Sequence, residues 1–391
     1  MTVYSIWPTF VCLALLMLLT YLPGFDRAGF KSTAVRVNAI DGVRGFLALG
    51  VAIHHSVIYY QFVRSGIWQV PPSRFYTLIG QVSVACFFMI TGYLFWAKIV
   101  RSKGRLDFAE LMKGRFFRLA PVYCLAVSLA VAIIVWKSGG ILKMPLSQYL
   151  LQIIQNMAIG IFPFTGMNNE PSSATILAGV TWTLQYEWQF YFALPALAIF
   201  ARQAHTHLPF AIVTLLTALL LVLMGGSSTL VFYVFFACGM VSASLEVSGY
   251  LLKLPKFVLS VLCTGCLIAI ILFYGSAYRP EVALLLGLAF YFLISGADLF
   301  GFLIAKPCVR LGEISYAVYM MQGLVLYALF AVQPFRDFAM ASDLNFWIAI
   351  LGVLVSLVLW ALAVHLFVER PGVELGRGEH EGHHNPASAH V

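Results

Sequence analysis

Long apolar runs dominate this sequence and limit what the chain can fold into. Eleven stretches are long and apolar enough to cross a bilayer, which takes about 20 mostly apolar residues in a helix. Hydrophobic residues make up 61% of the 391 residues and charged residues 10%, unlike a soluble domain. Despite the net charge of +8, this composition excludes a disordered or nucleic-acid-binding chain. The stretches are 4–22, 40–62, 77–98, 116–136, 178–200, 208–224, 229–247, 256–274, 281–300, 312–333 and 345–367.

The runs predict an all-α polytopic membrane protein, because no part of the chain shows the ten-residue alternation of a membrane β-barrel. A further apolar stretch, 148–163, is short and ends at Pro163. We expect it to be re-entrant or interfacial. Segment 4–22 lacks a basic leader region and a small-residue cleavage site, so a retained helix is favoured over a removed signal peptide.

The basic residues predict the orientation. If the helices alternate across the membrane, 17 of the 24 Lys and Arg residues fall on one side and six on the other. The positive-inside rule then puts the N-terminus outside and the C-terminus in the cytoplasm. We expect an extra N-terminal helix and cytoplasmic linker at 1–37, a membrane domain at 38–371 and a disordered polar cytoplasmic tail at 372–391.

Ionisable residues inside spanning segments are costly and indicate function. Arg44 and His55 are eleven residues apart, which places them about 20° from alignment on one helix face, roughly 16 Å apart. Asp41 lies one turn before Arg44 and can pair with it. The alternative is that Arg44 extends to the interface while His55 is a structural histidine bonded to a carbonyl. His54 points away from this face and is the weaker candidate.

The loop 98–118 carries seven Lys and Arg residues against two acids. Arg115 and Arg118 are spaced i, i+3, so both can face one anion at the start of the next helix. Two guanidinium groups suit a phosphate. Positive-inside topology or contact with anionic lipid explains the same residues equally well.

Glu187 lies among aromatic residues inside segment 178–200, where a carboxylate is expensive unless it is paired or protonated. Counting along the helices puts Glu187 about 13 Å and His55 about 8 Å below the outer boundary. We expect these two side chains to meet as an acid–base pair. A structural pair joining two helices is the alternative.

Two features near the C-terminus receive structural interpretations. Glu369-Arg370-Pro371 is expected to cap and stop the last helix, because proline cannot continue it. His365 is expected to be interfacial.

Six short motifs follow one another between residues 38 and 371. They are Asp-Gly-Val-Arg-Gly at 41–45 with His55; Phe-Phe-Met-Ile-Thr-Gly-Tyr at 87–93; Arg-Phe-Phe-Arg at 115–118 before Pro121; Trp-Thr-Leu at 182–184 with Glu187, Phe190 and Tyr191; Ile-Ser-Tyr at 314–316 with Tyr319; and Glu-Arg-Pro at 369–371. In this combination the chain resembles the acyltransferase family 3 of integral-membrane acyltransferases. Members transfer an acyl group, usually acetyl, from cytoplasmic acyl-CoA to surface glycans or other envelope acceptors.

The resemblance implies a core of ten spanning helices, so that segment 4–22 is an addition. It implies acetyl-CoA or another acyl-CoA as donor substrate, no permanently bound cofactor and no metal. The partners implied are a glycan or lipid-linked sugar acceptor, membrane lipids and glycan-assembly or export proteins, but no nucleic acid. The site residues are then His55 and Glu187 as catalytic groups, Arg44, Arg115 and Arg118 for acyl-CoA, and Asp41, Trp182, Tyr191 and Tyr316 in support.

The chain departs from the family pattern in three ways. Many members carry a histidine just after the Tyr-x-x-Tyr stretch, where this chain has Met321-Gln322. Thr91 and Thr183 replace serines and keep the hydroxyl group. There is no appended soluble domain, so we expect transfer to finish within the membrane domain or to pass to a partner.

In the mechanism we expect, the arginines hold the phosphates of acyl-CoA and the pantetheine arm reaches toward His55. His55 then acts as general base on the acceptor hydroxyl or as a transient acyl carrier, with Glu187 orienting it. The acceptor approaches from the outer side, by the loop 137–177. A transporter or flippase, and a scaffold in a glycan-export complex, remain alternatives, because a transport path also uses buried charges.

Overall fold

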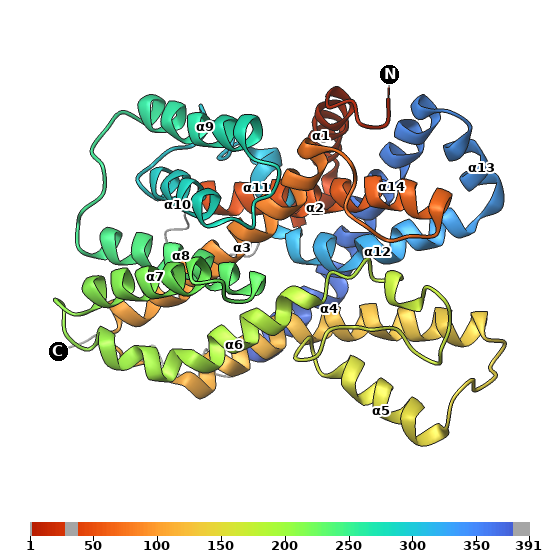
Figure 1. Cartoon of the computed structure of the whole chain (residues 1–391), viewed down its shortest axis with the longest axis horizontal. Helices are drawn as coiled ribbons and strands as arrows, with labels where there is room; N and C mark the ends of the chain where they lie inside the picture. Colours follow the sequence, from red (N-terminus) through yellow and green to blue (C-terminus); the bar gives the residue numbers. More distant parts are fainter. Residues whose placement is uncertain (1, 28–37, 378–391) are drawn as a thin grey trace, which may run out of the picture.

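The computed structural model describes residues 2–27 and 38–377, which form helices joined by turns and loops (Figure 1). This confirms the all-α class. The helices are α1 (Trp7–Leu19), α2 (Asn38–Ser65), α3 (Arg74–Arg101), α4 (Phe108–Lys137), α5 (Leu146–Met157), α6 (Trp182–Leu197), α7 (His207–Leu223), α8 (Val231–Val247), α9 (Lys256–Phe273), α10 (Pro280–Ile294), α11 (Lys306–Glu313), α12 (Ser315–Ala331), α13 (Gln333–Ala341), α14 (Asp343–Val364) and α15 (Arg370–Arg377), with a π-helical turn, η5 (His365–Glu369), between the last two.

Within the described residues, six helices are long and apolar enough to cross a membrane, and seven if the bent pair α11–α12 counts as one span. Three further apolar helices, α1, α7 and α10, have 13, 17 and 15 residues. At about 1.5 Å per residue these are shorter than a hydrocarbon core of about 30 Å. The structure thus supports a polytopic membrane protein, and the count of ten helices plus one stays a prediction.

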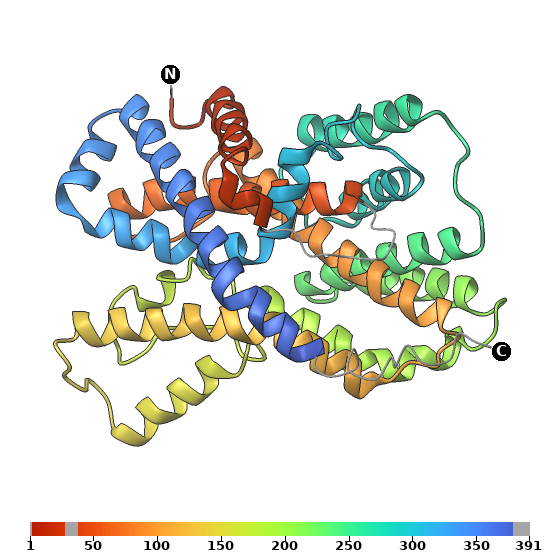
Figure 2. The same cartoon turned by 180° about the vertical axis from the view of Figure 1, so that it is seen from behind.

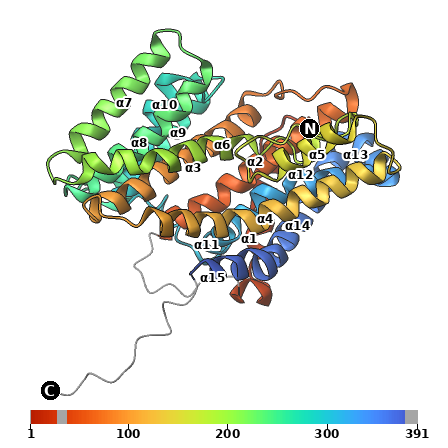
Figure 3. The same ribbon diagram turned by 90° about the horizontal axis from the view of Figure 1, so that it is seen from below.

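The helices form two groups that meet at α3. On one side α7, α8, α9 and α10 pack together, and on the other α2, α12, α13 and α14 do (Figure 1). Viewed from below, the first group stands apart from α4, α12 and α14, while α3 and α6 run between them (Figure 3). Because α3 packs on both α2 and α8, it connects the two groups.

Glycines set the closest helix approaches. Gly92 of α3 and Gly239 of α8 face each other, and a Cβ on Gly239 would lie 2.1 Å from the carbonyl oxygen of Met89. In α2, a Cβ on Gly45 would lie 2.7 Å from Leu311 of α11. Small residues let helix backbones approach closely in an apolar bundle. The glycines at 45 and 92, which belong to the sequence motifs, therefore have a packing role.

The predicted span 312–333 is not one straight helix. α11 and α12 are bent by 67° relative to each other at Ile314. Gly312, just before the bend, touches the backbone of α2, because a Cβ there would lie 1.8 Å from the carbonyl oxygen of Asp41. A straight helix and a bent pair of helices have the same apolar run in the sequence, so the bend could not be predicted. As a result α12 begins in the interior of the bundle, at Ser315.

The expected stop at Glu369-Arg370-Pro371 is wrong. α14 continues through η5 into α15, and Figure 2 shows the continuous blue helix running beside α4. Pro371 lies inside this continuous helix, directly after the π-helical turn η5, where the regular hydrogen-bond pattern of the helix is already interrupted. Residues 372–377, predicted as tail, are therefore helical, while 378–391 and the linker residues 28–37 lie outside the described residues. His365 is fully buried in the bundle, and its expected place at the membrane interface stays a prediction.

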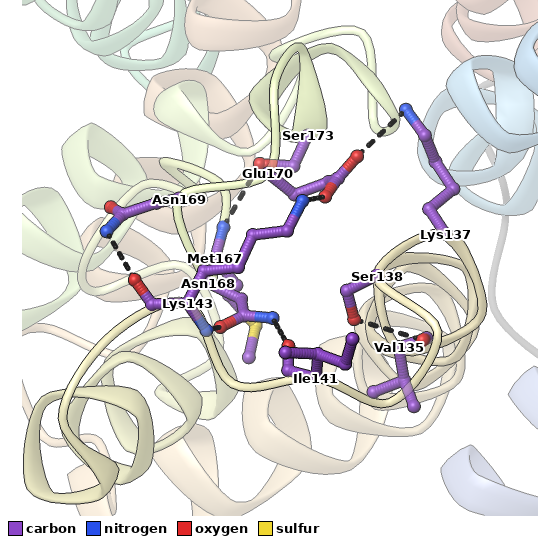
Figure 4. A network of polar contacts seen from close by, with 10 residues as sticks. All are labelled: Val135, Lys137, Ser138, Ile141, Lys143, Met167, Asn168, Asn169, Glu170 and Ser173. Atoms are coloured by element: carbon purple, nitrogen blue, oxygen red, sulfur yellow. Dashed lines mark hydrogen bonds and ion pairs between the residues drawn. The ribbon is translucent and has the colours of Figure 1, made fainter.

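A compact loop follows α4, and Glu170 is its centre (Figure 4). The Glu170 carboxylate pairs with Lys143 and lies 3.7 Å from Nζ of Lys137, at the end of α4. The side chain of Asn168 accepts a hydrogen bond from the backbone N–H of Lys143 at 2.8 Å and donates to the carbonyl of Ile141 at 2.9 Å. These bonds tie the segment before α5 to the segment after it.

The short apolar stretch forms α5, a helix too short to span. Leu146, Leu150 and Ile154 are 58%, 49% and 67% exposed and lie four residues apart along one face, whereas Asn156 is buried on the other. An apolar face turned away from the protein on a short helix is typical of helices that lie in a membrane interface. This favours the interfacial alternative for this segment over the re-entrant one.

Gly239→Ala should destabilise the protein, because its new methyl group would overlap the backbone of α3. We expect a loss of about 1–3 kcal/mol in the free energy of unfolding. Gly265→Ala in α9 is the matched control, because a Cβ there meets nothing within 4 Å and alanine favours a helix interior by about 0.5–1 kcal/mol. Thermal unfolding in detergent measures both variants; equal melting temperatures would contradict the close approach of α3 and α8.

Glu170 should make the stability of the α4–α5 loop depend on pH. The hydrogen bond from Lys143, and the charges of Lys143 and Lys137, hold the pKa of its carboxyl below its usual range. Because this pKa is lower in the folded than in the unfolded protein, the ionised carboxylate stabilises the fold at a pH above its unfolded-state pKa. That stabilisation is lost as the pH falls through the folded-state pKa. The melting temperature of wild type should be higher than that of Glu170→Gln at neutral pH, and this difference should disappear in acid. A gap that does not change with pH would refute this.

Candidate functional site

A cavity of about 600 Å³ lies between α3, α4, α6, α12 and α15. The loop after α3 borders it through Leu106 and Asp107, and Thr183 and Tyr319 line it deeper in the bundle. Six of the nine residues predicted for the site line this cavity: Arg44, Arg115, Arg118, Glu187, Tyr191 and Tyr316.

The three arginines come from two helices and are held by different partners. Arg44 of α2 lies 3.8 Å from the carboxylate of Asp41, which confirms the expected pairing of these residues. Arg118 of α4 forms a 2.8 Å ion pair with Glu369. The guanidinium of Arg115 stacks on the ring of Phe95 at 4.4 Å. All three thus have a defined place in the cavity wall, as the i, i+3 spacing predicts for Arg115 and Arg118.

Glu187 of α6 contributes a carboxylate to the cavity wall. The hydroxyl of Tyr191, one turn along α6, donates to Glu187 at 2.7 Å. Arg115 and Arg44 are the cations that act on this carboxylate. Glu187 therefore lines the same cavity as Arg44, Arg115 and Arg118.

The N-terminus of α12 opens into the cavity. Ser315, its first residue, lines the cavity and is 1% exposed. Among the residues that the structure describes, its hydroxyl oxygen is one of the few buried polar atoms without a hydrogen-bond partner. Next to it, the hydroxyl of Tyr316 donates to the carbonyl of Leu119 at 2.9 Å and so ties α12 to α4. An unpartnered hydroxyl at a helix N-terminus beside arginines suits an anionic ligand.

His55 lies outside this cavity. Its Nδ1 is 3.1 Å from Oε1 of Gln322, and its ring lies 6.0 Å from that of Trp68, centre to centre. The expected contact between His55 and Glu187 is not formed: each side chain has its own hydrogen-bond partner in the described structure. Counting residues along a helix estimates the depth of a side chain in the membrane but not the direction in which it points. The two side chains were therefore expected to meet although they point to different neighbours.

The neighbouring His54 has a structural role. Its Nδ1 donates to the carbonyl of Tyr76 on α3 at 2.6 Å, and its ring fills the space that a side chain on Gly80 would need. Trp182 is also structural: it packs with Phe88 and Phe232 in an aromatic cluster between α3, α6 and α8. Neither residue lines the cavity.

A comparison with known protein families identifies the family of this chain. Residues 37–366 match the family described as "Acyltransferase domain", acyltransferase family 3. The chain belongs to this family. No curated protein and no solved structure matches it significantly. The matched range begins after α1 and includes every predicted site residue.

Sequence reasoning missed three residues of this acyltransferase. Ser315 and Glu369 belong to quoted motifs, but they received no part in the site. Gln322 was noted as a departure from the family pattern and turns out to be the hydrogen-bond partner of His55. Glu369 has 0% exposure, and its second oxygen lies 2.8 Å from Nδ1 of His365. Its position within a π-helical turn, a feature often found at functional sites, is not visible in sequence.

The Arg118–Glu369 pair should stabilise this acyltransferase strongly. Removing one partner of a buried ion pair costs about 3–5 kcal/mol, and because Arg118 is partly exposed we expect Glu369→Ala to cost about 3 kcal/mol. Glu374→Ala is the matched control: Glu374 pairs with Arg370 on the exposed side of α15, and such pairs contribute below about 1 kcal/mol. Thermal unfolding in detergent compares the two variants, and similar losses would argue against a buried pair.

Proposed function

We propose that this membrane acyltransferase moves an acyl group, most simply acetyl, from cytoplasmic acyl-CoA to a hydroxyl group of a surface or secreted glycan. Family membership supports acyl transfer in a membrane protein. The cavity chemistry supports the donor.

The observation that carries the proposal is the grouping of Arg44, Arg115 and Arg118 with the free Ser315 hydroxyl around one cavity. Guanidinium groups bind phosphate through paired, charge-assisted hydrogen bonds, and CoA carries several phosphates. The cavity is also bordered by the basic loop that the positive-inside rule assigns to the cytoplasm, where acyl-CoA is found. Its aromatic and aliphatic walls suit a pantetheine arm.

His55 is the proposed reacting group. As a general base, it takes the proton of the acceptor hydroxyl while the oxygen attacks the thioester carbonyl. The C–O bond forms, the C–S bond breaks and the proton passes to the CoA thiolate. As an acyl carrier, its nitrogen attacks first and the acceptor oxygen then displaces it. Tyr319 lines the cavity and lies one turn from Gln322, the partner of His55, which puts Tyr319 on the route that we propose for the acyl group.

We propose a plasma (inner) membrane location with the N-terminus outside, the C-terminus in the cytoplasm and the acceptor on the outer side. The segregation of basic residues supports this orientation: Lys103 and Arg105 lie beside Arg202 in the fold, as expected for three residues assigned to one side. The outward apolar face of α5, in the loop assigned to the outer side, suits a position next to a lipid-linked acceptor.

His55→Ala should abolish transfer while CoA binding persists, because general acid–base catalysis contributes about 10²–10⁴-fold to rate. The measurement is CoA release and acyl label on the protein, from purified acyltransferase in nanodiscs supplied with labelled acetyl-CoA. His205→Ala, an exposed histidine, is the control. Label trapped on wild type would favour the acyl carrier. Unchanged transfer in His55→Ala would refute the scheme.

Arg115→Gln should weaken CoA binding about tenfold or more, since a hydrogen bond to a charged group contributes about 1.5–3 kcal/mol. Titration of CoA into nanodisc-embedded protein measures this. Arg279→Gln is the matched control, because Arg279 is exposed and pairs with Glu281 away from the cavity. If well-folded wild type binds no CoA, the donor assignment fails and a transporter becomes the better interpretation.

A further inference from the structure

We infer that Gln322 is a positioning residue whose amide fixes the tautomer of His55, with the hydrogen on Nδ1 and a free lone pair on Nε2. The inference deepens the proposed function and rests on it only for the role of Nε2 in transfer. The tautomer itself follows from two hydrogen bonds, which are independent of any substrate.

The first hydrogen bond fixes which way the amide of Gln322 points. Its Nε2 donates to the backbone carbonyl of Tyr319, one turn earlier in α12, at 2.9 Å. A carbonyl oxygen can only accept, so the amide NH₂ group has to be on this side. Gln322 is 0% exposed, and its surroundings therefore leave no room for water to satisfy a flipped amide.

The second hydrogen bond passes this constraint to the imidazole. With NH₂ bound to Tyr319, it is Oε1 of Gln322 that lies 3.1 Å from Nδ1 of His55. An amide oxygen has no hydrogen to give, so Nδ1 of His55 must be the donor. A neutral histidine carries one ring hydrogen, and Nε2 is left unprotonated. That nitrogen is the one able to accept a proton from a hydroxyl group or to attack a thioester.

A glutamine suits this position for a second reason. It accepts the Nδ1 hydrogen equally in the neutral and the protonated imidazole, so His55 can take up a proton at Nε2 and release it again without losing its orientation. A carboxylate in the same place would hold the protonated form. A histidine in the same place could itself change tautomer or charge, so it would define the hydrogen of His55 less strictly.

Other groups around His55 do not compete for Nδ1. His54, a titratable group on the same helix, has its ring centre 5.3 Å from that of His55, and its Nδ1 donates to the carbonyl of Tyr76. Trp68, from the loop after α2, and Tyr59, one turn on from His55, bring aromatic surface to this side of α2. Within the described residues, Gln322 is the one side chain that hydrogen-bonds to the ring of His55, and it accepts from Nδ1.

The first test reads the tautomer directly. Nitrogen-15 spectra of histidine-labelled protein in nanodiscs, compared between wild type and His55→Ala, identify the two ring nitrogens of His55. We expect a protonated Nδ1 and an unprotonated Nε2 near neutral pH, and a mixture or the reverse in Gln322→Leu. A wild-type His55 protonated on Nε2 would overturn the inference even if His55→Ala is inactive.

The second test uses the pH dependence of transfer. In Gln322→Glu the new carboxylate favours the imidazolium, so the acid limb of kcat/KM should move up by about one to three pH units. Gln322→Leu should lower kcat by about tenfold or more, since an incorrectly oriented imidazole is a poor base. Gln189→Glu, the same change on α6, should leave the acid limb in place. An acid limb that does not move in Gln322→Glu would overturn the inference.

These tests separate the inference from the proposed function. If His55→Ala retains transfer, the proposed function fails, although the tautomer spectrum can still show the expected pattern. If His55→Ala is inactive and the spectrum shows Nε2–H, the function stands and the role of Gln322 is refuted.

Discussion

Three arginines inside an apolar helix bundle need counter-charges from the protein, and much of the structure follows from how these are supplied. Asp41 comes from the helix that carries Arg44, whereas Glu187 and Glu369 come from α6 and from the turn before α15. A buried carboxylate that pairs across helices fixes their relative position, because separating the charges would leave both in a medium of low dielectric constant. In this protein the Arg118–Glu369 pair joins α4 to the turn before α15 beside the cavity.

The sequence predicted the membrane class, the arginine set and the pairing of Asp41 with Arg44. These depend on composition and on spacing along one helix, which a sequence contains. It did not predict which helices become neighbours. Glu187 was expected beside His55 and lies instead with the arginines, because the rotation of α6 about its axis is decided by packing of Trp182 and Phe190 against other helices.

The difference between local spacing and contacts between helices also explains the two errors in helix geometry. The bend at Ile314 and the continuation past Pro371 both depend on contacts with distant segments: Gly312 touches α2, and Gly372 and Gly376 let α15 lie against Pro121 and Phe117 of α4. Apolar runs and proline signals describe a helix in isolation. In this protein, contacts between distant segments outweigh the local preferences of the apolar run and of Pro371.

The hydrogen bonds of Tyr319 have a consequence for the membrane itself. Its hydroxyl group bonds to the hydroxyl of Thr183 at 3.0 Å and to the carbonyl of Val180 at 3.1 Å, where all three residues are buried. A path for an acyl group across a bilayer would also be a path for protons and small ions if it stayed open. For the transfer that we propose, a hydrogen-bonded tyrosine in the cavity wall would preserve the electrical insulation of the bilayer between turnovers.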